Sequence, residues 1–233
     1  MITFRFALIV FAVLAAALML SCKHRQREVS SSDGADLDPC STSNDYFPPP
    51  AANWPGGKLH FGADQGAWEA NFLRHMHEPS LYACIPATAE PVYRFLWDRS
   101  LSEPVAARLV VHNDGSGILF VKMLAHGTML PPPETGVKPV SQDEWYRMKL
   151  EHEIALTPEQ VRRALNLVNQ IEFVTESNSH ETTDGSDWIF ESKVKGKYKL
   201  VDFRNIPTVP ARELGLYLVL DLAKLPIPTD AIY

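Results

Sequence analysis

Four charged residues near the C-terminal end of the chain are the first candidates for a polar site. Asp202 and Arg204 lie at the end of a predicted strand, and Arg212 and Glu213 follow at the start of a predicted helix. We expect their side chains to cluster where that strand meets that helix. Either the charges pair with one another and position the helix, which the sequence favours, or they bind a polar ligand.

Signatures of the common enzyme classes are missing from the sequence. Gly115-Ser116-Gly117 does not fit the G-x-S-x-G nucleophile motif, and the chain has no phosphate-binding glycine loop, dinucleotide fingerprint or H-E-x-x-H zinc motif. His152 falls on the apolar side of a predicted strand, whereas Glu151 and Glu153 fall on its polar side, so the three do not form a triad. We therefore assign no catalytic residue, and the sequence favours a protein without enzymatic activity.

Two short segments carry groups that bind metal ions in other proteins. In His75-Met76-His77-Glu78 the histidines are two residues apart, so on a helix they point to different sides. Asp184-Gly185-Ser186-Asp187 places two carboxylates in a turn but lacks the ladder of oxygen ligands and the distal glutamate of a calcium loop. A surface pair and a turn are the favoured interpretations, so the sequence predicts neither a metal ion nor a cofactor.

The N-terminal segment has the features of a bacterial export signal in the usual order. Arg5 precedes an uncharged run from Phe6 to Leu20, which is short for a membrane-spanning helix of about 20 apolar residues. The run ends in Met19-Leu20-Ser21-Cys22, which resembles the lipobox of bacterial lipoproteins. This resemblance implies that residues 1–21 are a cleaved signal peptide and that Cys22 carries lipid. An uncleaved anchor helix, or cleavage at another position, is the alternative.

The same resemblance predicts where the protein resides. Several acyl chains on Cys22 would each bury many methylenes, at about 0.8 kcal/mol per methylene, and so hold the chain on a membrane with the domain facing the periplasm. Enteric lipoproteins that stay at the inner membrane usually have aspartate after the cysteine, whereas this chain has Lys23. The outer membrane is therefore favoured over the inner membrane.

Cys40 and Cys84 are the cysteines that remain once Cys22 is assigned to lipid. Thiols of an exported protein meet an oxidising compartment, so we expect these two to form a disulfide, with two free thiols as the alternative. Closing a loop of this length contributes about 3–4 kcal/mol in the chain-entropy model, less any strain. The bridge would fix the end of the N-terminal tether to the folded domain.

Net charge limits the kinds of partner. The full chain has 22 basic and 28 acidic residues, and removal of residues 1–21 takes away only Arg5, which leaves 21 basic against 28 acidic residues and a net charge of −7. Surfaces that bind nucleic acid are basic. We therefore predict no nucleic-acid partner.

Composition divides the rest of the chain into a tether and one domain. Residues 22–57 are rich in serine, proline and glycine, so they are predicted to be the lipidated N-terminus and a disordered tether that buries too little apolar surface to fold. About 35 flexible residues span roughly 30–35 Å. Phe47 and Trp54 are the tether residues able to dock onto the domain. Residues 58–233 are predicted to form a single globular α+β domain.

Hydrophobic periodicity predicts an antiparallel sheet of about six strands in this domain. A three-stranded meander spans 93–98, 105–112 and 118–125, and a further, strictly alternating strand spans 147–156. A C-terminal hairpin follows. A two-residue loop at Lys195-Gly196 is favoured because it matches aromatic with apolar residues, pairing Trp188 with Phe203 and Phe190 with Val201. A three-residue loop, which would pair different residues, is the alternative.

Three helices are predicted to pack on this sheet. The N-terminal helix, over residues 64–76, has large apolar residues on one face: Trp68, Phe72 and Met76. The middle helix is amphipathic and opens with a capping box formed by Thr157 and Gln160. The C-terminal helix, over residues 210–224, is apolar nearly all round and is therefore predicted to be buried.

The C-terminal part of the domain carries a set of residues that suggests a family. They are Tyr93-Arg94-Phe95-Leu96-Trp97, Asp184-Gly185, Trp188, Gly196-Lys197-Tyr198, Val201, Arg204 and Arg212-Glu213-Leu214-Gly215. This part, roughly residues 90–225, resembles a family of uncharacterised bacterial proteins, many of them classed as lipoproteins. The family has no activity to carry over, so the resemblance supports the domain boundary alone.

Together these features favour a non-enzymatic lipoprotein of the cell envelope that binds another protein in the periplasm. A specific version is an immunity or inhibitor protein against a periplasmic toxin or hydrolase, because acidic inhibitors often meet basic active-site clefts. Two alternatives stay open. One is a hydrolase of wall or lipid material that uses His152, Asp202 or Glu213, and the other is a structural component of the envelope.

Overall fold

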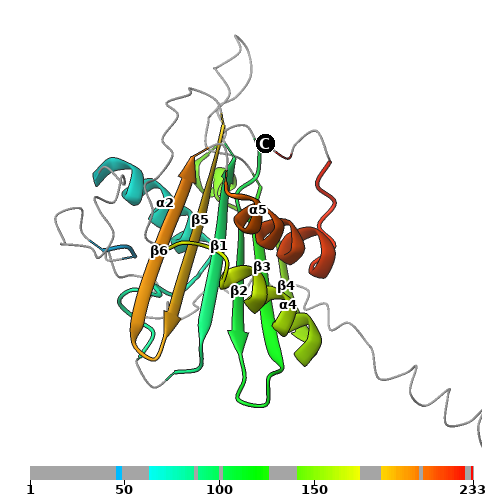
Figure 1. The fold of residues 1–233 in the computed structure, drawn as a ribbon. Helices are drawn as coiled ribbons and strands as arrows, with labels where there is room; N and C mark the ends of the chain where they lie inside the picture. The colour runs from blue at the N-terminus through cyan, green and yellow to red at the C-terminus, as the bar shows by residue number, and fades with distance from the viewer. Residues whose placement is uncertain are drawn as a thin grey trace, which may run out of the picture. The chain divides into compact units, whose positions relative to one another are not determined.

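In the part of the chain that the structure describes, six antiparallel strands form one open sheet (Figure 1). This computed structural model describes residues 46–48, 63–86, 89–99, 102–125, 141–173, 185–204, 207–228 and 232. The order across the sheet is β4-β3-β2-β1-β5-β6. The strands are β1 (Val92–Arg99), β2 (Val105–Val111), β3 (Gly117–Leu124), β4 (Met148–Leu156), β5 (Ser186–Val194) and β6 (Lys197–Arg204). The predicted meander, further strand and C-terminal hairpin are therefore confirmed.

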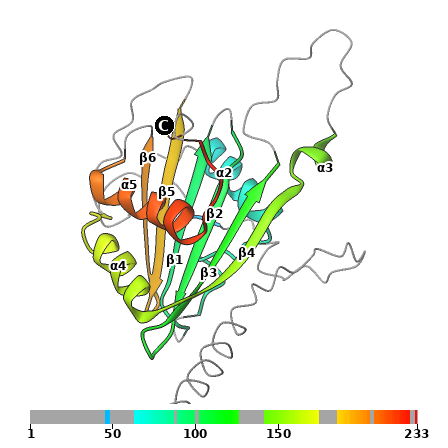
Figure 2. The ribbon, with the colours of Figure 1, turned by 90° about the vertical axis from the view of Figure 1, so that its right-hand side faces the viewer.

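Helices cover both faces of this sheet (Figure 2). Helix α2 (Ala63–His75) packs on one face. Helix α4 (Pro158–Val168) packs on the other face together with α5 (Val209–Leu216) and the π-helical turn η1 (Tyr217–Leu222) that continues it. A short helix, α3 (Gln142–Trp145), precedes β4. The predicted α+β fold is thus confirmed, with the sheet as the middle of three layers.

The larger core lies between the sheet and the α4/α5 layer. Strand alternation places Phe95 and Trp97 of β1 on this face, directly opposite Phe190 and Trp188 of β5. The ring centroids of Phe95 and Phe190 are 4.7 Å apart, as are those of Trp97 and Trp188. Across the next pair of strands, Trp188 is opposite Phe203 and Phe190 is opposite Val201. This confirms the predicted hairpin register.

The smaller core lies under α2 and corrects one prediction. Phe72 and Met76 are buried against the sheet as predicted, but Trp68 is 39% exposed. Its edge contacts the ring of Phe72, with centroids 5.7 Å apart. The buried side of the helix instead includes Leu73 and Glu69, because the side that faces the sheet is rotated away from Trp68.

Helices α4 and α5, on the other face of the sheet, both begin where the sequence predicted. Thr157 caps α4: its hydroxyl accepts from the Gln160 backbone N–H, and the Gln160 side chain accepts from the Thr157 N–H. The predicted C-terminal helix begins near Pro210 as expected but changes to the wider π-helical winding at Tyr217. Its outer side carries exposed charges, including Asp221, so it is buried on one side and not all round.

Part of the predicted tether contacts the domain. Tyr46 lies within residues 22–57, yet its side chain is fully buried beside α2, and its hydroxyl donates to the carbonyl of Glu78 at 2.8 Å. The other predicted boundaries, including those of the signal peptide, lie outside the described residues. None of the described helices is long and apolar enough to cross a membrane.

Candidate functional site

The structure separates the four charged residues that the sequence suggested as a cluster. Asp202 and Arg204 alternate along β6 with Val201 and Phe203, whose side chains belong to the core under α5. The two charged side chains therefore face the other way, towards the α2 layer. Arg212 and Glu213 are exposed on α5, across the sheet. The prediction of one site at the strand–helix junction is wrong because strand alternation sends the two halves to opposite faces.

Asp202 belongs instead to a group of carboxylates under α2. Asp98 of β1 is directly opposite Asp187 of β5, and Asp187 is directly opposite Arg204 of β6. Glu69 reaches the same place from α2, so that one oxygen each of Glu69, Asp98 and Asp187 lies within 4.8 Å of the other two. We call Glu69, Asp98, Asp187 and Asp202 the carboxylate cluster.

Three members of the carboxylate cluster are buried, whereas the side chain of Asp187 is 18% exposed. Glu69 is 1% exposed and Asp202 is 9% exposed. Burial, together with the charge of Asp98, raises the pKa of Glu69 well above its usual range. Burial and the charge of Asp187 raise the pKa of Asp202 to about 7, although Arg204 opposes the rise. The charged form of a carboxyl group is unfavourable at this depth. Such a group therefore either keeps its proton or lies beside a cation.

The basic side chain of Arg204 contacts the carboxylate cluster. Arg204 pairs with Asp187, with 3.3 Å from its Nε to Oδ1. Within the described residues, Oε2 of Glu69 and Oδ1 of Asp202 are buried without a hydrogen-bond partner. Most buried side-chain polar atoms in proteins have such a partner. The cluster can therefore share protons among its carboxyl groups or hold a positively charged ligand.

A second set of buried charges lies beside it on the same face and is internally paired. Glu78 accepts from Arg108 Nε at 2.7 Å and lies 3.2 Å from Lys122 Nζ. Burial would raise the pKa of Glu78, but Arg108 and Lys122 outweigh burial and lower it. Arg94 Nε donates to Glu191 Oε2 at 2.6 Å. Each of these two buried acids therefore has at least one basic partner, and Lys122 also lies 3.5 Å from the exposed Glu151. We interpret these pairs as structural.

The histidines flagged in the sequence do not form a site. The ring of His75 stacks on Tyr146 at 4.1 Å, whereas His77 is exposed and has a left-handed backbone conformation, with φ of 51°. His152 is half-buried on β4, which forms the edge of the sheet opposite β6 and Asp202. Glu213 is on α5. The three residues that the hydrolase hypothesis requires are therefore not brought together.

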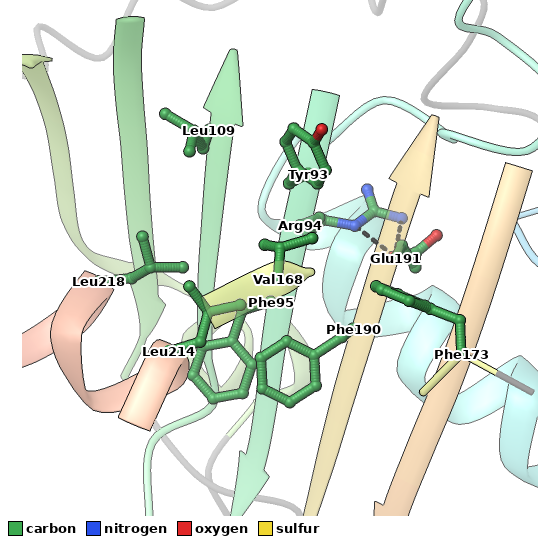
Figure 3. Close-up of a pocket in the computed structure, with 10 residues that line it drawn as sticks. All are labelled: Tyr93, Arg94, Phe95, Leu109, Val168, Phe173, Phe190, Glu191, Leu214 and Leu218. Carbon is green, nitrogen blue, oxygen red and sulfur yellow. Dashed lines mark hydrogen bonds and ion pairs between the residues drawn. The ribbon is translucent and has the colours of Figure 1, made fainter. Parts of the chain in front are cut away.

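A small cavity on the α5 side of the sheet offers no alternative site (Figure 3). Its volume is about 10 Å³, which is about the space of one water molecule. Apolar side chains dominate its wall, including Phe95, Phe190, Leu214 and Phe173. Figure 3 also shows Arg94 bonded to Glu191, so those polar groups are occupied with each other. The cavity is a packing defect too small for a metabolite.

The cysteine predictions stay untested. Cys22 and Cys40 lie outside the described residues, and Cys84 lies partly buried in the turn that follows α2. Both the lipid on Cys22 and the pairing of Cys40 with Cys84 therefore remain predictions.

Comparison with known proteins found no match. No family model matches the chain, and no curated protein or solved structure is similar to it.

Sequence reasoning missed three members of the carboxylate cluster for two reasons. Asp98 was not singled out, because it alternates with the aromatic residues of its strand and only the packing of α2 shows what lies against it. Asp187 was interpreted as part of a turn. Glu69 did carry a signal, because it precedes Phe72, Leu73 and Met76 at spacings of three, four and seven, which places it on the buried side of the helix.

Proposed function

We propose that this protein is a non-enzymatic, lipid-anchored protein of the bacterial cell envelope that binds another protein in the periplasm. The export signal, the lipobox resemblance at Cys22 and the acidic net charge support the location and the kind of partner. The specific version that we favour is an immunity or inhibitor protein that neutralises a periplasmic toxin or hydrolase. The binding surface is β4.

The edge position of β4 is the observation that carries this proposal. Within the described residues β4 pairs with β3 alone, so its other side has no neighbouring strand there. It is nine residues long and regular apart from one irregularity near its start. Edge strands of this kind expose backbone N–H and C=O groups that pair with an extended segment of a partner.

The side chains of β4 suggest the charge of that segment. Glu151 and Glu153 are exposed on β4, and Glu151 is 3.5 Å from Lys122. Glu153 projects from the middle of the strand with no ion pair to a described residue. A partner strand with basic residues opposite Glu153 would complement it, and such complementarity mainly speeds association and selects the partner. A basic active-site cleft is one surface of this kind.

Affinity capture with a charge-reversal variant tests the proposal. The tagged full-length protein would be purified from envelope extracts, and from extracts of competing bacteria, with wild type compared with Glu153→Lys and with Glu213→Lys as the matched control on α5. We expect one partner that wild type and the control capture equally. Glu153→Lys should bind it about tenfold more weakly, which corresponds to about 1.4 kcal/mol. Absence of any specific partner, or equal capture by all three proteins, would contradict the proposal.

A further inference from the structure

We propose that the carboxylate cluster under α2 binds a divalent cation that prefers oxygen ligands, with Ca²⁺ as the ion that fits best. Glu69, Asp98 and Asp187 supply the first ligands, and Asp202 lies beside them as a further carboxylate. This site is independent of the proposed protein-binding strand: the carboxylate cluster lies on β1, β5, β6 and α2, and the binding surface is β4.

Three separate elements converge on the site. Asp98 and Asp187 are fixed opposite each other by the β1–β5 register, an arrangement that places like charges side by side and is unfavourable by itself. Glu69 is positioned by α2, whose neighbouring Phe72 and Leu73 are buried in the smaller core. Because packing and strand pairing hold all three carboxylates, the site is largely built before any ion arrives.

The uncompensated oxygens provide the second line of support. Oε2 of Glu69 and Oδ1 of Asp202 are inaccessible to solvent and accept no hydrogen bond within the described part of the chain. Glu78 on the same face shows the contrast, because it is equally buried but lies against Arg108 and Lys122. A buried carboxylate without such a basic partner is expected where a cation takes the partner's place.

The ligand type and spacing indicate the class of ion. Carboxylate oxygens without sulfur or imidazole suit Ca²⁺, Mg²⁺ or Mn²⁺ more than Zn²⁺ or Cu²⁺. Calcium binds oxygen at about 2.3–2.6 Å, so two oxygens on opposite sides of it are about 5 Å apart. The limit of 4.8 Å among the three carboxylates falls within that span. Magnesium would need a tighter octahedron and several retained waters, for which a buried site leaves little room.

Such an ion would attach α2 to the sheet. Glu69 is the contribution of the helix, whereas Asp98 and Asp187 belong to the central strands β1 and β5. Binding would therefore stabilise the folded chain and in particular the α2 layer. By mass action a ligand at a hundred times its Kd raises the Tm of a domain of this size by about 5–10 °C.

The test uses the full-length protein after treatment with a chelator. Calcium binding would be measured by isothermal titration calorimetry and by the Tm, with Tb³⁺ luminescence as a second probe of the same site. The variants are Glu69→Gln and Asp98→Asn, and Glu213→Gln is the matched control at an exposed position on α5. We expect one Ca²⁺ per chain, a rise in Tm of about 5–10 °C for wild type and control, and at least tenfold weaker binding for both cluster variants.

Two results would overturn the proposal. If Ca²⁺, Mg²⁺ and Mn²⁺ all leave the Tm of wild type unchanged, the carboxylate cluster holds protons and not a metal ion. If wild type and both cluster variants bind Ca²⁺ equally, the ion binds elsewhere on the acidic chain. Glu69→Gln keeps the size of the side chain and removes a buried carboxylate whose Oε2 has no hydrogen-bond partner among the described residues, so this variant is expected to remain folded. Asp98→Asn provides the second measurement should it not.

Discussion

Among single residues, Glu69 and Glu78 are equally buried, yet their pKa values are shifted in opposite directions. Both side chains are almost fully inaccessible and both face the α2 side of the sheet. Arg108 and Lys122 overcome the desolvation of Glu78 and lower its pKa, whereas Glu69 meets Asp98, Asp187 and Asp202 and its pKa is raised. Charge partners, and not depth alone, therefore decide whether a buried acid supports the fold at neutral pH.

Asp202 gives a pH prediction for the metal-free protein. Its folded-state pKa is raised to about 7, against about 3.9 in an unfolded chain. Between these values the folded state keeps a proton that the unfolded state has lost. Its contribution to the free energy of unfolding therefore falls as pH rises, by about 1.4 kcal/mol per pH unit, and levels off above pH 7. In chelator, Asp202→Asn should reduce this fall between pH 5 and 8, as urea denaturation will show.

The control for that measurement is Glu153→Gln, which replaces an exposed acid and should leave the pH dependence of wild type intact. A fall in stability of the same size in wild type and in Asp202→Asn would contradict the assignment of the titration to Asp202.

Gly215 of α5 gives a packing prediction. A Cβ at this position would lie 2.8 Å from Cζ of Phe95 and 2.9 Å from Cζ3 of Trp188, closer than carbon atoms approach each other. Both rings are held in the larger core, and the cavity beside Phe95 has a volume of only about 10 Å³. Gly215→Ala should therefore lower the free energy of unfolding by about 1–3 kcal/mol. Glu213→Ala, exposed on the same helix, should change it by less than about 0.5 kcal/mol in the same denaturation experiment.

Among the helices, strands and turns, the sequence correctly predicted the features that depend on neighbouring residues. The alternation of β4, the Thr157–Gln160 cap and the Lys195-Gly196 turn each depend on a few neighbouring residues, and all are present. Which face of a strand another element covers depends on distant packing. For that reason the sequence misjudged the rotation of α2 around Trp68 and the grouping of Asp202 with Glu213, and it did not single out Asp98.

The ion pair between β1 and β5 gives a prediction at this scale. Arg94 and Glu191 are directly opposite each other on these strands, and both are buried. Replacing Arg94 with methionine leaves an unpaired buried acid and should cost about 3–5 kcal/mol of stability. Replacing Glu191 with methionine as well should recover most of that loss. A double variant as unstable as Arg94→Met alone would show that the arginine acts through other contacts, such as its bond to the Pro79 carbonyl.

At the scale of the whole molecule, we propose a lipid anchor, a tether and a domain whose edge strand β4 pairs with β3 alone within the described residues. Tyr46 contacts the domain within the predicted tether, so the free length of chain between Cys22 and the domain is shorter than residues 22–57 suggest. Roughly twenty-odd residues before Tyr46 still span about 25 Å if flexible. That length leaves β4 room to meet a partner away from the membrane surface.

The anchor itself has a direct test. Cells given a labelled fatty acid should incorporate it into wild type and not into Cys22→Ser, because the proposed lipid would be attached through the sulfur of this cysteine. Equal label in both proteins would contradict the anchor and leave the domain without its proposed membrane attachment.

The central claim is that β4 is the surface on which a partner protein binds, and site-specific photocrosslinking in living cells measures this directly. A photoreactive amino acid would replace Glu153 on β4 in one strain and Glu213 on α5 in another, both exposed positions. We predict a discrete crosslinked species of higher mass from position 153 and none from position 213. Crosslinks that are absent from position 153, or equally strong at position 213, would contradict β4 as the binding surface.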